Sequence, residues 1–247
     1  MCTLILAWRV FEDTPIAAAA NRDESLGRPS TPPSVSEPDR RPRVVAPRDE
    51  RAGGTWIGYN DRGVFVAITN RWVTTTADGE RSRGLLVDDA LGEPTADAAR
   101  SLVERELETR RYDPFHLVIA DETDCVLIEW GDVHRTRAFE PGVHVVVNVG
   151  ADGDWFVPAV RPDAGNQQAA NAERVREEME PRSGETAADW TRRAGEVLGN
   201  HEFGVCIHGD GFGTRSSSLV RLGDERSFEF ADGPPCEHAH ERVEGTI

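Results

Sequence analysis

The chain opens with Cys2-Thr-Leu-Ile-Leu-Ala-Trp8, and after an Asp13-Thr-Pro15 turn it continues with Ile16-Ala-Ala-Ala-Ala20. Both segments are apolar and β-rich, so they predict an antiparallel hairpin. Chain ends normally fray, and an N-terminus held inside a sheet therefore needs a physical reason. This hairpin is the feature on which the prediction of the fold depends.

Several further elements follow the hairpin. Residues 25 to 50 contain Pro29, Pro32, Pro33, Pro38, Pro42 and Pro47, and they predict a long, non-repetitive loop over the core. Strands are predicted at 55–59 and 63–69, joined by a turn at 60–63. Ser82 and Thr95 are the predicted N-caps of two helices that end near Leu91 and Arg110.

The second half of the chain repeats this grouping. A meander is predicted from strands at 115–120, 125–130, 133–138 and 143–147, followed by helices at 166–180 and 185–198 and strands at 203–208, 217–222 and 227–230. Strands thus come in hairpins and helices in pairs, without strict βα alternation. The pattern predicts an α+β fold with two antiparallel sheets flanked by helices, in a single domain spanning residues 1–247.

Length and composition bound the class of protein. The chain has 247 residues, of which 38% are hydrophobic, and no run approaches the roughly 18 apolar residues of a membrane-spanning helix. The first thirty residues carry several charges, so we expect no signal peptide and no membrane insertion. The cysteines, Cys2, Cys125, Cys206 and Cys236, form no C-x-x-C pair. This spacing argues against a zinc cage or a disulfide framework and predicts a cytoplasmic, reducing location.

The charge balance is strongly acidic. The formal net charge is -16, from 44 acidic and 28 basic residues, and every basic residue is arginine. Such a surface repels phosphate groups, so nucleic acid and anionic membranes are not expected partners. A halophilic origin would explain the acidity, because concentrated salt screens the self-repulsion. A GC-rich genome is the alternative explanation for arginine in place of lysine.

Cys2 follows the initiator methionine directly, and methionine is readily removed before a small residue. Removal of Met1 would leave an α-amine, with an ordinary pKa of about 7.7–8.0, beside a thiol of pKa about 8.5. One residue would then supply both a nucleophile and a base. The alternative is that Cys2 is simply a small apolar residue on a core strand.

Five polar or glycine-rich motifs accompany Cys2 along the chain. They are Asn21-Arg-Asp-Glu24, Gly53-Gly-Thr-Trp56, Thr69-Asn-Arg71, Ser82-Arg-Gly84 and Gly213-Thr-Arg-Ser-Ser217. Together with Cys2, and in this order, they resemble the NRDE family, also called the transport and Golgi organisation protein 2 family, from residue 2 to about 220. Members of that family look like N-terminal nucleophile hydrolases of the four-layer αββα type, related to cysteine-class penicillin acylases and bile salt hydrolases.

The resemblance implies a role for each of five residues. It makes Cys2 the nucleophile and Asp23 the carboxylate that binds the α-amine. It makes Asn70 and Asn148 the asparagines of the oxyanion hole, and Arg215 a basic residue near the nucleophile. An oxyanion donor of this kind typically contributes about 10²- to 10³-fold in rate.

One position departs from the pattern of the related acylases. They carry an arginine directly before the asparagine of the motif at 21–24, where this chain has Ala20. Arg22 is a candidate to take over, although strand alternation was expected to turn its side chain to the opposite face. A structural clamp on the proline-rich loop is the other interpretation of Arg22.

Arg22, Trp56, Arg71 and Trp72 are the candidate substrate-binding residues. The two tryptophans could line an acyl pocket, or could equally be core residues. Gly53-Gly54 would let backbone approach a ligand, or would simply make a turn.

We expect neither a metal nor a cofactor. The segment Cys236-x-His238-x-His240 could suggest a metal site, but it follows the last predicted strand and is interpreted as a solvated tail. The chain lacks the phosphate-loop and nucleophile-elbow motifs.

Two functions remain open from the sequence. The first is a hydrolase or acyltransferase that acts on a linear amide, a non-peptide C–N bond, in a small-molecule substrate. The second, permitted by the family resemblance, is a non-catalytic binding or trafficking protein that holds a hydrophobic ligand such as haem or an acyl-lipid in the same pocket. The sequence does not specify the oligomeric state.

Overall fold

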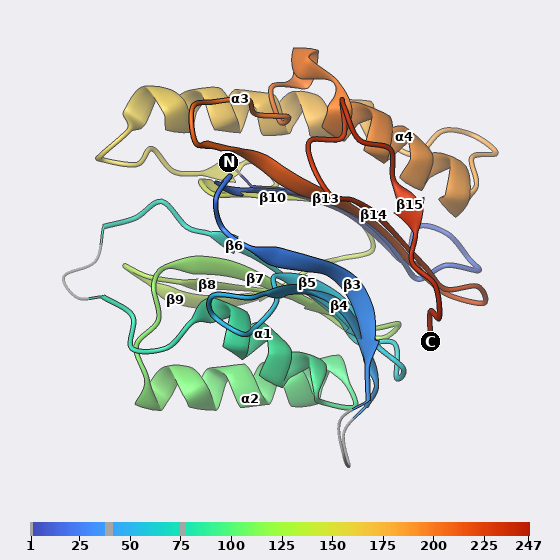
Figure 1. The fold of residues 1–247 in the computed structure, drawn as a ribbon, viewed down its shortest axis with the longest axis horizontal. Coiled ribbons are helices and arrows are strands. Elements are labelled where there is room, and N and C mark those ends of the chain that lie inside the picture. Colours follow the sequence, from blue (N-terminus) through green and yellow to red (C-terminus); the bar gives the residue numbers. More distant parts are fainter. Residues whose placement is uncertain (1, 38–41, 75–77) are drawn as a thin grey trace. The chain divides into compact units, whose positions relative to one another are not determined.

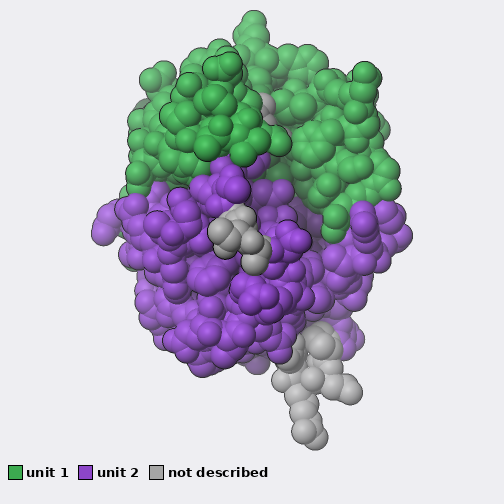
Figure 2. All heavy atoms as spheres, turned by 90° about the vertical axis from the view of Figure 1, so that its left-hand side faces the viewer, with its two compact units in different colours: residues 1–28, 141–243 green, residues 29–140, 244–247 purple. Residues whose placement is uncertain are grey.

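The computed structural model describes residues 2–37, 42–74 and 78–247. They form two compact units, coloured separately in Figure 2: unit 1 comprises residues 1–28 and 141–243, and unit 2 comprises residues 29–140 and 244–247. Met1 and Pro38, which enter the predictions above, lie outside the described residues. The assignment of a single domain stays a prediction.

Unit 1 is built on an eight-stranded antiparallel sheet with the order β12-β11-β10-β1-β2-β13-β14-β15. Its strands are β1 (Thr3–Trp8), β2 (Ile16–Ser25), β10 (Gly142–Val147), β11 (Gly150–Ala151), β12 (Asp154–Trp155), β13 (Phe212–Leu222), β14 (Ser227–Ala231) and β15 (Glu241–Arg242). The N-terminal strand β1 lies between β2 and β10, and all six of its residues are buried. The predicted hairpin is therefore confirmed.

Two helices, α3 (Pro162–Glu178) and α4 (Ala187–Gly199), pack over one face of this sheet (Figure 1). Both were predicted within a few residues of their ends. Asn21 of β2 ties the sheet to this helical layer, because its side-chain amide donates to Leu198 O at 3.0 Å and to Val205 O at 2.9 Å. The polar motif in β2 thus has a structural role as well.

Unit 2 is built on a seven-stranded antiparallel sheet with the order β3-β4-β5-β6-β7-β8-β9. Its strands are β3 (Ser30–Ser36), β4 (Val44–Asp49), β5 (Ile57–Asn60), β6 (Phe65–Asn70), β7 (Phe115–Ala120), β8 (Cys125–Trp130) and β9 (His134–Ala138). Helices α1 (Arg83–Leu91) and α2 (Ala96–Thr109) pack on this sheet and complete its apolar core (Figure 1). Ser82 and Thr95 cap them as predicted, accepting from Gly84 N at 3.2 Å and Ala98 N at 3.1 Å.

The prediction of a loop over residues 25–50 is wrong. Much of this segment forms β3 and β4, which pair with each other at one edge of the sheet. Proline lacks an N–H donor, but an edge strand tolerates it, particularly at a bulge. Pro32 and Pro33 lie at such a register shift, between Thr31 and Ser34. The proline content was therefore compatible with an edge strand.

Two predictions in the second half also need correction. The expected four-stranded meander contains only β7, β8 and β9, because β10 joins the other sheet beside β1. The predicted strand at 203–208 begins instead in a 3₁₀ turn, η1 (His201–Phe203), and continues as a loop into β13. Within the described residues, no helix has the length and apolar character required to span a bilayer.

Candidate functional site

Cys2 directly precedes the central strand β1, which begins at Thr3. Its side chain is half-buried, and its Sγ lies 3.6 Å from the backbone oxygen of Asp23. Its backbone nitrogen donates to Oδ1 of Asn148 at 3.0 Å. In the chain as it stands this nitrogen is an amide, and it stands in for the α-amine that removal of Met1 would create.

Asn148 follows β10 directly and is buried. Besides Cys2 N, its Oδ1 accepts from Nε2 of Gln168 on α3 at 2.9 Å. Two donors therefore fix the orientation of the Asn148 amide. Sequence reasoning missed Gln168, because a single glutamine in a polar helix carries no signal.

Asp23 lies in β2 and is 4% exposed. The hydroxyl of Thr214, its register partner on β13, donates to Asp23 Oδ1 at 2.6 Å. Thr214 belongs to the quoted motif at 213–217, but the sequence assigned it no role. The structure therefore brings Cys2, Asp23 and Asn148 together within unit 1, and adds Gln168 and Thr214 as supports.

Desolvation is the largest influence on the pKa values of Cys2 and Asp23. Desolvation raises the pKa of the Cys2 thiol, and the nearby Asp23 carboxylate raises it further, while Arg22 opposes both. Desolvation also raises the pKa of Asp23, against the lowering effect of the Thr214 hydroxyl. A thiol whose pKa is raised is protonated at neutral pH and needs a base before it can act as a nucleophile.

The expected orientation of Arg22 is wrong. Side chains alternate along a strand with a period of two, so Arg22 and Ala20 of the continuous strand β2 share a face. Arg22 is buried, and its Nη2 lies 3.8 Å from Oε2 of Glu24. Its charge lowers the pKa of the Cys2 thiol, which is the direction expected for a cation that replaces the missing arginine at position 20.

Arg215 lies at an irregularity of β13. The pairing of β13 with β2 shifts register between Thr214 and Ser216, so Arg215 has no register partner on β2. Its Nη1 makes an ion pair of 2.7 Å with the exposed Asp232. The guanidinium of Arg215 is therefore paired with a carboxylate at the surface of unit 1.

The remaining candidates belong to unit 2. Asn70 is the exposed last residue of β6, and Arg71 after it makes an ion pair with Asp132. Trp56 and Trp72 are both half-buried, which is compatible with either interpretation of them.

In the motif at 53–56, Gly54 packs against the backbone of another segment. A Cβ on Gly54 would lie 2.1 Å from the carbonyl carbon of Gly84, and Thr55 N donates to Gly84 O at 3.0 Å. Within unit 2, the close approach of these two chain segments therefore explains the glycines of the motifs at 53–56 and 82–84.

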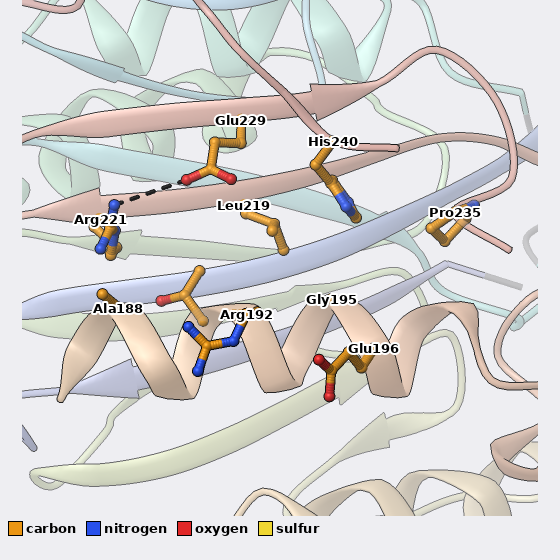
Figure 3. Close-up of a pocket in the computed structure, with 10 residues that line it drawn as sticks. Ala188, Arg192, Gly195, Glu196, Leu219, Arg221, Glu229, Pro235 and His240 are labelled. Carbon is orange, nitrogen blue, oxygen red and sulfur yellow. Dashed lines mark ion pairs between the residues drawn. The ribbon is translucent and has the colours of Figure 1, made fainter. Parts of the chain in front are cut away.

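A hollow of about 440 Å³ lies beside α4 in unit 1 (Figure 3). Figure 3 shows Arg192 and Glu196 on its α4 side and an ion pair between Arg221 and Glu229 of β13 and β14 on the sheet side. None of the predicted site residues lines this hollow. We assign it no role in the chemistry of Cys2.

Several solved structures share this fold. Penicillin V acylase from Agrobacterium tumefaciens superposes with a TM-score of 0.58 at 13% identity, covering 94% of this chain and 83% of that one. The N-acylethanolamine-hydrolyzing acid amidase orthologue of Caenorhabditis elegans gives 0.58 at 12% identity, covering 89% and 92%. A conjugated bile acid hydrolase from Clostridium perfringens gives 0.52 at 10% identity, covering 100% and 97%. The fold is thus that of the αββα N-terminal nucleophile hydrolases, as predicted.

Sequence comparison then defines the family. The profile of the Transport and Golgi organisation 2 family matches residues 1–233, and the chain belongs to this family. The Transport and Golgi organization protein 2 homologue of Bos taurus is 28% identical over 143 residues, which cover 56% of this chain and 51% of that protein. The human homologue is 33% identical over 104 residues, which cover 42% and 37%. The chain thus spans about half or less of the length of these relatives.

Proposed function

We propose that the protein is an N-terminal cysteine hydrolase or acyltransferase that acts on a linear amide, with Cys2 exposed as the first residue after removal of Met1. The observation that carries the proposal is the contact of 3.0 Å between Cys2 N and Asn148 Oδ1, beside the buried Asp23. This contact holds the nitrogen that would become the α-amine. The amide-cleaving activities named for the structural relatives agree with this reaction type.

In the proposed reaction, the α-amine of Cys2 takes the thiol proton and Sγ attacks the carbonyl carbon of the amide. Collapse of the tetrahedral intermediate breaks the C–N bond, and the protonated amine gives its proton to the leaving nitrogen. The acyl group remains on Cys2 as a thioester. Water that loses a proton to the same amine then releases the acid and restores the thiol, whereas an acceptor nucleophile would give acyl transfer.

The other candidates support this sequence of steps. Asp23 holds the ammonium form of the amine, and Asn148 Oδ1 orients it. The Asn148 amide nitrogen is the proposed donor to the oxyanion, and Arg22 lowers the pKa of the thiol. Arg215, which belongs to the same unit as Cys2, is proposed to lie on the substrate side of the site.

The decisive experiment combines intact mass spectrometry with a panel of N-acyl amides. We expect a mass without Met1, a hydroxylamine-sensitive acyl adduct on Cys2, and a loss of turnover of at least about 10³-fold in Cys2→Ala. Cys125→Ser, which removes a buried thiol on β8 of the other unit, is the matched control and should keep the activity. A retained Met1, or undiminished turnover in Cys2→Ala, would overturn the proposal.

Binding experiments with the same variants distinguish this enzyme from the alternative, a non-catalytic binding or trafficking protein. Binding of haem or an acyl-lipid without turnover, at an affinity that Cys2→Ser does not change, would favour a binding or trafficking protein.

A further inference from the structure

Four metal-ligating side chains of unit 1 converge from three separate segments. His201 lies in η1, Cys206 and His208 lie in the loop before β13, and Cys236 follows β14. One ligand atom from each residue lies within 4.8 Å of all the others. None of these contacts involves the candidate site at Cys2.

The spacing of three of the four donor atoms is close to that of a tetrahedral metal site, and the His201 ligand atom lies within 4.8 Å of the others. Cys206 Sγ lies 3.5 Å from Cys236 Sγ and 3.7 Å from His208 Nε2, and His208 Nε2 lies 3.1 Å from Cys236 Sγ. Zinc bonds of about 2.3 Å to sulfur and 2.0–2.1 Å to nitrogen place tetrahedral ligand atoms roughly 3.3–3.8 Å apart. An ion at the centre would therefore need only small side-chain movements.

The segments that carry the donors are held by hydrogen bonds outside the cluster. Asn21 holds Val205 O, and Ile207 forms paired bonds with Thr214, from Ile207 N to Thr214 Oγ1 at 2.9 Å and from Thr214 N to Ile207 O at 2.8 Å. Gly204 ends the 3₁₀ turn with a positive φ of 66°, and its carbonyl accepts from Asn171 at 3.0 Å. The backbone on both sides of Cys206 is thus positioned before any ligand binds.

A carboxylate lies near the second ring nitrogen of His208, beyond hydrogen-bond distance. His208 directs Nε2 to Cys236, while its Nδ1 lies 3.9 Å from Oε1 of Glu237. A carboxylate at the second ring nitrogen orients a ligating imidazole and raises its basicity. The ring of His201 lies beside that of His208, with centroids 5.1 Å apart.

We propose that His201, Cys206, His208 and Cys236 bind one zinc ion in a closed tetrahedral site. Two thiolates and two imidazoles form the Cys₂His₂ set that Zn²⁺ prefers, and four protein ligands leave no open position for catalysis. The ion would act structurally, by joining the loop before β13 to the segment after β14. Because Thr214 bonds both Ile207 and Asp23, this loop also supports the carboxyl beside Cys2.

A disulfide between Cys206 and Cys236 is the competing chemistry. A disulfide would use only the two cysteines, and it would not explain why His201 and His208 lie beside them. Zinc uses all four, so the whole cluster favours the ion.

The experiment uses tag-free full-length protein titrated with Zn²⁺ and Co²⁺ under reducing conditions. We expect one equivalent of zinc by elemental analysis, and a cobalt complex with the strong visible absorption and thiolate charge-transfer band of tetrahedral coordination. Cys206→Ser and His208→Gln should each weaken zinc binding at least about tenfold. His238→Gln, in the same segment but outside the cluster, is the matched control and should bind normally.

Three outcomes would overturn the proposal. They are the absence of stoichiometric zinc, cobalt binding without the tetrahedral spectrum, and full zinc affinity in Cys206→Ser. A mass two hydrogens below the reduced value, with Cys206 and Cys236 peptides linked, would establish the disulfide instead. The cobalt spectrum of the unmodified protein keeps the test decisive even where a variant fails to fold.

The sequence indicates a solvated tail for the C-terminal segment; Cys236 and His238 are exposed as expected, but the segment is joined to the rest of unit 1. Cys236 belongs to the cluster, His240 Nε2 lies 3.0 Å from Ser217 Oγ, and β15 pairs with β14. Of the three residues in the Cys236-x-His238-x-His240 pattern, only Cys236 is in the cluster.

Discussion

Asp23 places a carboxyl in a buried position, at 4% exposure. Desolvation raises its folded-state pKa above the ordinary value of 3.8. A carboxyl with a raised pKa binds more protons in the folded state than in the unfolded state. The stability of the fold therefore falls as the pH rises from 3.8 through the folded pKa. Such a cost is typical of functional sites, where the chemistry requires the charge.

Asp23→Asn tests this cost directly. Asparagine keeps an oxygen that can accept from Thr214 and removes the buried charge. We expect a larger free energy of unfolding than in the unmodified protein at neutral pH, and a difference that shrinks as the pH falls toward 3.8. Urea denaturation over a pH series measures it, and amide turnover should be lost in the same variant.

The control is Asp210→Asn, an exposed carboxyl in the same unit. It should change the free energy of unfolding by less than about 0.5 kcal/mol. An Asp23→Asn protein less stable than the unmodified one throughout the pH series would contradict the expectation.

At the scale of elements, two motifs serve packing within unit 2. Gly54 precedes β5, and its Cα faces the first turn of α1 at Gly84 so closely that no side chain fits between them. This contact sets the distance between helix and sheet. The motifs at 53–56 and 82–84 therefore do not require a ligand to explain their glycines.

Gly54→Ala should lower the free energy of unfolding by at least about 2 kcal/mol, because its Cβ would lie 2.1 Å from a backbone carbon. Thermal and urea denaturation measure the loss. Gly27→Ala has no atom within 4 Å of the added Cβ and should be nearly neutral. Equal stability of the two variants would show that α1 moves aside without cost.

Asn60 organises the turn between β5 and β6. Its Nδ2 donates to Leu91 O and Glu93 O, both at 2.8 Å, and its Oδ1 accepts from Arg62 N and Val64 N at 3.0 Å. The side chain is fully buried. It therefore joins the hairpin to the end of α1.

Asn60→Ala should destabilise the protein by about 2–4 kcal/mol, since each buried polar group left without a partner costs about 1–3 kcal/mol. The exposed Asn166 on α3 provides the comparison, and Asn166→Ala should change stability by less than about 0.5 kcal/mol. A loss below about 1 kcal/mol in Asn60→Ala would mean that water replaces the amide.

At the scale of the whole molecule, charge is the dominant feature. A net charge of -16 on 247 residues gives long-range repulsion at low ionic strength. Raising KCl from about 0.1 M to about 1 M shortens the Debye length from about 10 Å to about 3 Å. The repulsion is screened at the higher concentration, which is the physical basis of the halophile hypothesis.

We therefore expect the Tm to rise by at least about 4 °C over this range, or about 1–2 kcal/mol for a protein of this length. Calorimetry measures the shift, and urea rather than guanidinium denaturation should confirm it, because guanidinium is itself a salt. A maximum Tm at low salt would contradict the halophile hypothesis and favour a GC-rich genome as the source of the arginine bias.

The sequence by itself determined what depends on neighbouring residues. The N-terminal hairpin, the turn at 60–63, the caps Ser82 and Thr95 and the two helix pairs all follow from periodicity and local hydrogen bonding. The motif order also identified the family, and with it the fold class.

Only the tertiary structure decided what depends on residues far apart in the chain. It placed β10 beside β1 and made strands of the proline-rich segment, because strand pairing is a non-local choice that local propensity does not control. It brought Asn148 to Cys2 across 146 residues, and gathered His201, Cys206, His208 and Cys236 into one cluster. Cys206 and His208 are neighbours in the sequence, but only the folded backbone brings His201 and Cys236 to them.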